Sequence, residues 1–112
     1  QLKSRNSGMS KVKLFLASEL EVSEIRQVEL DAREPIAIYN LDGEYFATDD
    51  TCTHGNASMA EGDIDGSEVY CPFHMGAFDI RTGEATVAPC SVPLKTYEVV
   101  IEDGYLFILM ED

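Results

Sequence analysis

The sequence is poor in the residues that define several common classes of protein. It has no tryptophan, two histidines and three cysteines among 112 residues. An odd number of cysteines argues against a framework of disulfides. We find no secretory signal peptide and no apolar run long enough to span a bilayer. These absences favour a protein of the reducing cytoplasm, without a membrane partner.

Positive charge is also scarce, with 8 Lys and Arg against 21 Asp and Glu and a formal net charge of -13. Residues 1–8 are polar and patternless and precede Met9, so we interpret them as a vector-derived remnant. Because Lys3 and Arg5 lie in it, the native part is two units more acidic, near -15. Such a charge excludes nucleic acid and anionic membranes as natural partners. It suits a protein partner with a basic docking face, although solubility alone is the alternative.

No stretch has a sustained helical period, and the runs between turn signals are short and rich in β-formers. Asp42-Gly43 and Glu102-Asp103-Gly104 each separate two apolar runs, which predicts two hairpins. Residues 17–20 are expected to form a brief turn or a single helical turn. The predicted strands are 12–16, 25–30, 36–40, 44–48, 68–70, 77–79, 97–101 and 105–109.

The segment between the hairpins differs in composition. Residues 50–93 hold five of the eight glycines, three of the four prolines and all three cysteines. We therefore predict an all-β fold, an antiparallel β-sandwich or barrel, with a loop-rich lobe at about 48–93 inserted between two of its strands. Residues 9–112 are expected to form one domain.

The lobe contains two short motifs that could bind metal. Cys52-Thr53-His54-Gly55 and Cys71-Pro72-Phe73-His74 each offer one thiolate and one imidazole in a turn-like context. Four such ligands can hold zinc, or two irons bridged by sulfide. A Cys2His2 zinc finger instead pairs its cysteines in one knuckle and its histidines on a helix. We predict Cys52, His54, Cys71 and His74 as metal ligands.

These two motifs and their spacing resemble those of Rieske [2Fe-2S] proteins. The resemblance extends to the approach at 45–50 and to the exit at 76–79, 82–84, 89, 93–94 and 97–99. The short, acidic chain is similar to the ferredoxins of bacterial aromatic-ring dioxygenases. This likeness implies a monomeric one-electron carrier rather than an enzyme. Its partners would be an NADH-dependent flavin reductase and a terminal Rieske non-haem iron oxygenase.

The resemblance also implies individual roles for the ligands. Cys52 and Cys71 would bind the inner iron of one [2Fe-2S] cluster, and His54 and His74 the outer iron, nearer to solvent. Imidazole ligands leave the oxidised cluster without net charge, so it accepts an electron more readily than an all-cysteine cluster.

High-potential members of the family carry an extra cysteine in each loop and two hydroxyl groups that donate to sulfur. The matching positions here are Ala57 and Phe73, which exclude that disulfide, and Gly76 and Phe78, which lack a hydroxyl. Fewer donors stabilise the reduced cluster less. The sequence therefore points to the low end of the Rieske range, around -150 mV.

Several neighbours of the motifs have two interpretations. Pro89 either closes a loop over the cluster or marks a turn between strands. We expect Cys90 to be a small buried or half-buried thiol without a ligand role. Met59, Phe73 and Met75 either form an apolar docking tip or pack beneath the loops. Two other functions stay open, namely a small subunit of a nitrite reductase-like enzyme and a structural zinc module.

Overall fold

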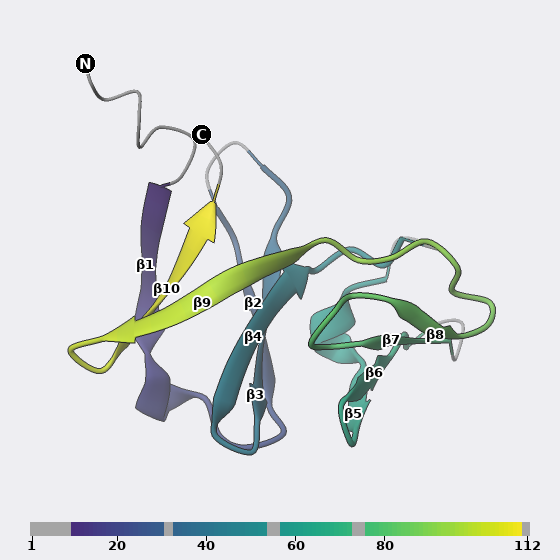
Figure 1. The fold of residues 1–112 in the computed structure, drawn as a ribbon, viewed down its shortest axis with the longest axis horizontal. Coiled ribbons are helices and arrows are strands. Elements are labelled where there is room, and N and C mark those ends of the chain that lie inside the picture. The colour runs from purple at the N-terminus through teal and green to yellow at the C-terminus, as the bar shows by residue number, and fades with distance from the viewer. Residues whose placement is uncertain (1–9, 31–32, 54–56, 73–75, 111–112) are drawn as a thin grey trace.

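The computed structural model describes residues 10–30, 33–53, 57–72 and 76–110, and within them the chain forms two antiparallel sheets (Figure 1). The larger sheet has six strands in the order β1-β10-β9-β4-β3-β2, and the smaller has four in the order β5-β6-β7-β8. The strands are β1 (Ser10–Leu16), β2 (Ile25–Val28), β3 (Ile36–Leu41), β4 (Glu44–Asp49), β5 (Asp63–Asp65), β6 (Glu68–Tyr70), β7 (Ala77–Asp79), β8 (Ala85–Val87), β9 (Thr96–Glu102) and β10 (Tyr105–Met110).

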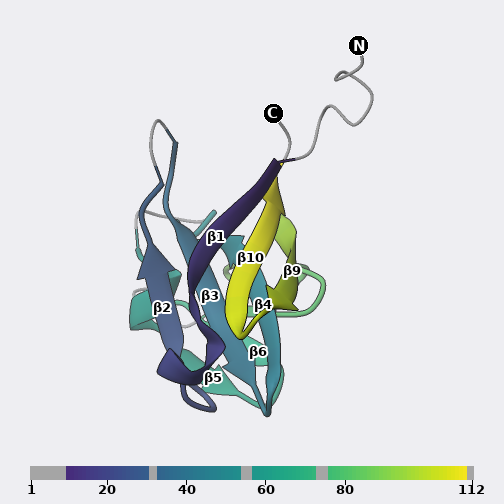
Figure 2. The ribbon, with the colours of Figure 1, turned by 90° about the vertical axis from the view of Figure 1, so that its left-hand side faces the viewer.

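The six-stranded sheet curls into the base of the molecule and wraps around its own apolar core (Figure 2). The four-stranded sheet lies entirely between β4 and β9 in sequence and forms a lobe to one side of the base (Figure 1). The predicted all-β class and the inserted lobe are therefore confirmed. The core of the base consists of Leu20, Ile36, Ile38, Ala47, Leu106, Ile108 and Met110.

Both predicted hairpins are present, and both close with a two-residue turn. Asp42 and Gly43 have φ angles of 54° and 94°, and Asp103 and Gly104 have 53° and 82°. Positive φ at both central residues is the geometry of a primed turn, which matches the twist of the strands it joins. Glu102 pairs with Tyr105 inside the ladder, so the second turn is one residue shorter than expected.

Strand β3 is buried along its whole length and faces two different cores. Ile36 and Ile38 point into the core of the base, while Ala37, Tyr39 and Leu41 point to the other side. Successive side chains of a strand lie on opposite faces of the sheet. A strand that is covered on both faces therefore has mainly apolar residues at successive positions in the sequence. This strand is the wall on which the lobe packs.

The structure departs from the sequence prediction in short elements. Strand β2 ends at Val28 rather than at residue 30, and β5 and β8 were not predicted. A three-residue strand offers little alternation to recognise, so the sequence predicted two strands of this length, β6 and β7, and missed two others. The expected turn after β1 is a 3-10 helix, η2 (Ala17–Glu19), and a second one, η3 (Met59–Glu61), precedes β5. In the described part of the chain no helix has the length and apolarity needed to cross a membrane.

Candidate metal centre

The two predicted motifs begin in loops that close in the same way. The Cys52 backbone N–H donates to the carbonyl oxygen of Ala57 at 2.9 Å, and the Cys71 N–H donates to that of Gly76 at 2.8 Å. In each case the bond spans five residues and draws the two ends of the loop together. Each cysteine is thus fixed at the base of a closed loop in which a histidine lies two or three residues further on.

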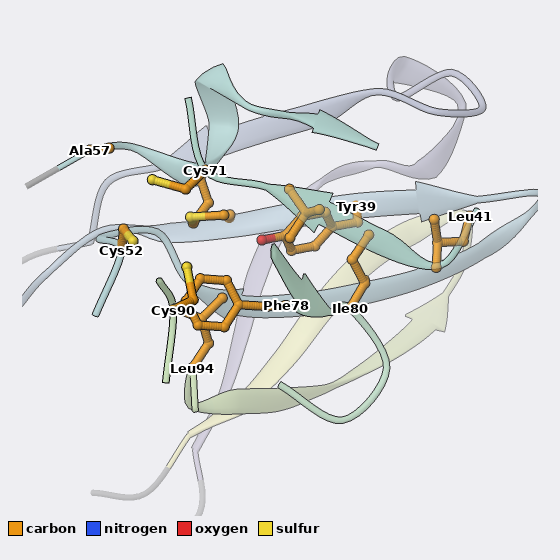
Figure 3. Close-up of a cluster of buried hydrophobic side chains, with 12 residues drawn as sticks. Tyr39, Leu41, Cys52, Ala57, Cys71, Phe78, Ile80, Cys90 and Leu94 are labelled. Carbon is orange, nitrogen blue, oxygen red and sulfur yellow. The ribbon is translucent and has the colours of Figure 1, made fainter. Parts of the chain in front are cut away.

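The thiols of Cys52 and Cys71 are buried, with exposed fractions of 2% and 1%. Both belong to a second apolar core between the lobe and the outer face of β3, and Figure 3 shows their side chains in the same part of it. His54 and His74 lie outside the described residues. In the residues that are described, no three His, Cys, Asp or Glu side chains gather closely enough to hold a metal ion. The full ligand set therefore stays a prediction.

A buried carboxylate anchors the start of the first loop. Asp50 is 1% exposed, and it accepts hydrogen bonds from Gln27 Nε2 at 2.7 Å, Ser58 Oγ at 2.6 Å and the Ala60 N–H at 2.9 Å. Its carbonyl also accepts from the Met59 N–H at 2.7 Å. One side chain thus joins β2, the end of β4 and η3, two residues before Cys52. Sequence reasoning missed this role, because adjacent Asp49 and Asp50 look alike in the sequence.

A hydrogen bond joins the segment after β8 to the first loop. Thr53 Oγ1, one residue after Cys52, donates to the carbonyl oxygen of Val92 at 2.6 Å. Val92 is 57% exposed, as is Val22, and these two are among the few large apolar residues on the described surface. This apolar side chain beside the site was not predicted. The idea that Pro89, in the same segment, covers a cluster stays a prediction.

Cys90 is buried, as predicted, and it lies against the two other cysteines (Figure 3). Its thiol lies within hydrogen-bonding reach of the side chain of Cys52. Burial above all, followed by the charge and nearness of Cys52, raises the pKa of the Cys90 thiol to about 11. The thiol also stands 2.6 Å from the point where a Cβ on Gly76 would lie. Only glycine at position 76 leaves room for it.

The apolar neighbours separate into packing and exposed residues. Met59 is fully buried in the second core, so its interpretation as part of a docking tip is wrong. The Met59 N–H donates to the Asp50 carbonyl oxygen, and the Met59 side chain is buried rather than facing solvent. Phe73 and Met75 lie outside the described residues. Ala57 and Phe78, at two positions that differ from high-potential proteins, are both buried in the second core.

The donor chemistry fits an iron–sulfur cluster. Two buried thiols lie together in an apolar core, at the bases of two loops that each carry one imidazole. Thiolates are the usual ligands of such clusters, and imidazole replaces two of them in the Rieske type. A tetrahedral zinc ion would accept the same four ligands, so donor type alone leaves both open.

Comparisons with known proteins decide between these classes. Residues 10–98 match the Rieske [2Fe-2S] domain family. The chain therefore belongs to the Rieske [2Fe-2S] family, which implies a [2Fe-2S] cofactor rather than zinc. The ferredoxin component of the p-cumate 2,3-dioxygenase system of Pseudomonas putida is 46% identical over 98 residues, which cover 87% of this chain and 83% of that protein.

Ferredoxin CarAc of Metapseudomonas resinovorans is 41% identical over 100 residues, covering 89% of this chain and 94% of that protein. A solved complex of oxygenase and ferredoxin in carbazole 1,9a-dioxygenase contains a chain with a TM-score of 0.85 and 41% identity. That match covers 88% of this chain and 91% of the other.

The class within the family follows from these relatives. They are electron-transfer ferredoxins, so this chain is a Rieske-type carrier and not a catalytic enzyme. The nitrite reductase alternative has less support. A chain described as the small subunit of an NADH-dependent nitrite reductase of Mycobacterium tuberculosis has a TM-score of 0.80 but 19% identity, which shows a shared fold alone.

Proposed function

We propose that this protein carries single electrons from an NADH-dependent flavin reductase to the terminal oxygenase of an aromatic-ring dioxygenase system. The observation that carries the proposal is the pair of matched cysteine loops, each closed over five residues with its thiol buried in one core. Relatives that are 41% and 46% identical are ferredoxins, and one is named as a component of a dioxygenase system.

We assign the cofactor ligands to the two loops. Cys52 and Cys71 would hold the inner iron of the [2Fe-2S] cluster, and His54 and His74 would hold the outer iron. When bound, the cluster supplies reversible one-electron chemistry. The chain contributes the environment. Burial of both thiols keeps water from the cysteine side of the site.

The surface of the chain supports a protein partner. The formal net charge of -13 favours encounter with a basic docking face. Beside the first loop, the exposed Val92 side chain offers an apolar contact that becomes buried when a partner covers it. We place the electron-transfer contact at this end of the lobe. The protein acts in the cytoplasm as a monomer of 12.4 kDa, a mass that sedimentation of the purified carrier would check.

Spectroscopy of the reduced protein tests the ligand set. The dithionite-reduced protein should give an electron paramagnetic resonance signal with the low average g value of a Rieske centre. His54→Ala and His74→Ala should each abolish this signal, because each removes one of two protein ligands from the outer iron. Glu44→Gln serves as the control, since it alters only an exposed ion pair with Arg81. A normal Rieske signal in either histidine variant would contradict the assignment.

A reconstituted system tests the carrier role. NADH and the flavin reductase of an aromatic-ring dioxygenase system should reduce the protein, and the reduced protein should then support hydroxylation by the matching oxygenase. Omitting the carrier should stop product formation. If the reductase and oxygenase give the same turnover with and without the protein, the proposed function is wrong even when the cluster is present.

A further inference from the structure

Cys90 is the third thiol of the site, and neither the ligand assignment nor the carrier role requires it. It comes from the segment that follows β8, far in sequence from both loops. Nevertheless it is 5% exposed and shares one core with Cys52 and Cys71. Figure 3 shows the labelled side chains of all three cysteines gathered at the same end of that core.

The position of Cys90 is tightly set by its neighbours. A Cβ built on Gly76 would lie 2.6 Å from Cys90 Sγ, 2.9 Å from Cys90 N and 2.9 Å from the Val87 carbonyl oxygen. Any side chain at position 76 would therefore displace the thiol. The Cys90 backbone N–H donates to the same Val87 oxygen at 3.2 Å, which holds the residue from its main chain.

The Cys90 thiol lies within hydrogen-bonding reach of the Cys52 side chain, while Cys71 acts on it through charge alone. In a pair of cysteines of which one is a metal ligand, the ligand is a thiolate and can only accept, so the other must donate. Hydrogen bonds to the sulfur ligands are among the main determinants of reduction potential in iron–sulfur proteins. Gly76 and Phe78 carry no hydroxyl group, so neither supplies the O–H donor that the resemblance associates with high-potential proteins.

We propose that Cys90 is a positioning residue of the cluster, whose S–H donates to Cys52 Sγ and raises the reduction potential above the value set by the ligands alone. The proton stays on Cys90 throughout. One electron added to the site increases the negative charge on the accepting sulfur, and the donor therefore stabilises the reduced form more than the oxidised form. The inference rests on the proposed assignment of Cys52 as a ligand.

Three substitutions separate donation from packing. Cys90→Ala removes the donor and leaves a small void, Cys90→Val removes the donor but fills the space, and Cys90→Ser keeps a donor of similar size. The reduction potential of the loaded proteins is measured by protein-film voltammetry. The Cys90→Ala and Cys90→Val substitutions should each shift the redox equilibrium about three- to tenfold toward the oxidised form. This corresponds to a fall in reduction potential of up to about 59 mV. The Cys90→Ser substitution keeps a donor, so its fall in reduction potential should be no more than half as large.

Vibrational spectra give a second readout. In D₂O the thiol proton exchanges for deuterium, so resonance Raman bands of iron–cysteine stretching should shift in the wild type and in Cys90→Ser. Part of this isotope shift should be missing in Cys90→Ala and Cys90→Val. A purely structural role for Cys90 would leave the isotope shift the same in all four proteins.

The outcomes are decisive in both directions. Potentials of Cys90→Ala and Cys90→Val that equal the wild-type value would overturn the proposal, and so would an equal fall in all three variants, because packing would then explain it. A Rieske spectrum that is absent from the wild type would instead refute the ligand assignment. The two failures are therefore distinguishable.

Discussion

Removing the Asp50 carboxylate should destabilise the protein strongly and loosen the first cysteine loop. In Asp50→Ala, the hydrogen bonds from Gln27 Nε2, Ser58 Oγ and the Ala60 N–H lose their acceptor. Gln27 is exposed and recovers water, but Ala60 N–H is held in place by η3. A hydrogen bond to a charged acceptor contributes roughly 1.5–3 kcal/mol, so losing two of them without replacement costs about 3–6 kcal/mol.

That loss is a large fraction of the stability of a small domain, about 5–15 kcal/mol in total. Asp50→Asn keeps one acceptor oxygen but turns an N–H₂ group toward other donors, and we expect a loss of about 1–3 kcal/mol. Urea unfolding followed by circular dichroism measures the free energy of unfolding. The visible absorbance of the cluster, followed under chelator challenge, reports whether the loop loosens.

Glu44→Gln is the matched control, because it weakens an exposed ion pair with Arg81 at 3.0 Å. Such a pair contributes under about 1 kcal/mol. The expected order of stability is wild type, Glu44→Gln, Asp50→Asn and then Asp50→Ala. An Asp50→Ala protein within 1 kcal/mol of the wild type, with unchanged cluster release, would refute the view that this carboxylate anchors the loop.

Three further outcomes are expected. Phe78→Tyr, if the new hydroxyl reaches Cys52 or Cys71 sulfur, should raise the reduction potential by some tens of millivolts in voltammetry, against a wild-type value that is clearly negative; a wild-type potential near +300 mV would contradict this view of the site. Stopped-flow electron transfer to the oxygenase should slow as salt rises, because screening weakens attraction between the acidic carrier and a basic face; a rate independent of salt would assign the acidity to solubility. Burial raises the pKa of Tyr39 above its ordinary value. Above about pH 10 the unfolded chain therefore loses the tyrosine proton before the folded protein does, and the free energy of unfolding should decline as pH rises further. Urea midpoints should decline less steeply in Tyr39→Phe, which has no hydroxyl to titrate.

Features that depend on local sequence were predictable. Asp-Gly turns fixed both hairpins, because only a few residues accept positive φ at two successive positions. The two Cys/His pairs indicated the ligands because each pair lies within one short loop. The family match over residues 10–98 concerns the domain, and the ligand set stays a prediction because both histidines lie outside the described residues.

Features that depend on contacts between distant segments were not predictable. Asp50 differs from its neighbour Asp49 only in its surroundings. Asp50 is enclosed by β2 and η3, whereas Asp49 faces Arg33 and Tyr97. The nearness of Cys90 to Cys52 likewise arises from folding of the segment after β8. No pattern in the sequence indicates the enclosure of Asp50 or the nearness of Cys90 to Cys52.

The connection between base and lobe explains how a β-scaffold can hold the loops in place. Strands β4 and β9 pair through only Ala47 with Tyr97 and Thr48 with Thr96, and the chain both enters and leaves the lobe there. This short pairing would be weak alone. It is extended by the Asp49 N–H, which donates to the Lys95 carbonyl oxygen at 2.9 Å, and supported from behind by a buried hydrogen bond of 2.8 Å between the hydroxyls of Tyr39 and Thr48. Because β3 carries that tyrosine on the face that packs against the lobe, the same strand that completes the core of the base also sets the position of the first loop. The base therefore acts on the site through β3 and the ends of β4 and β9.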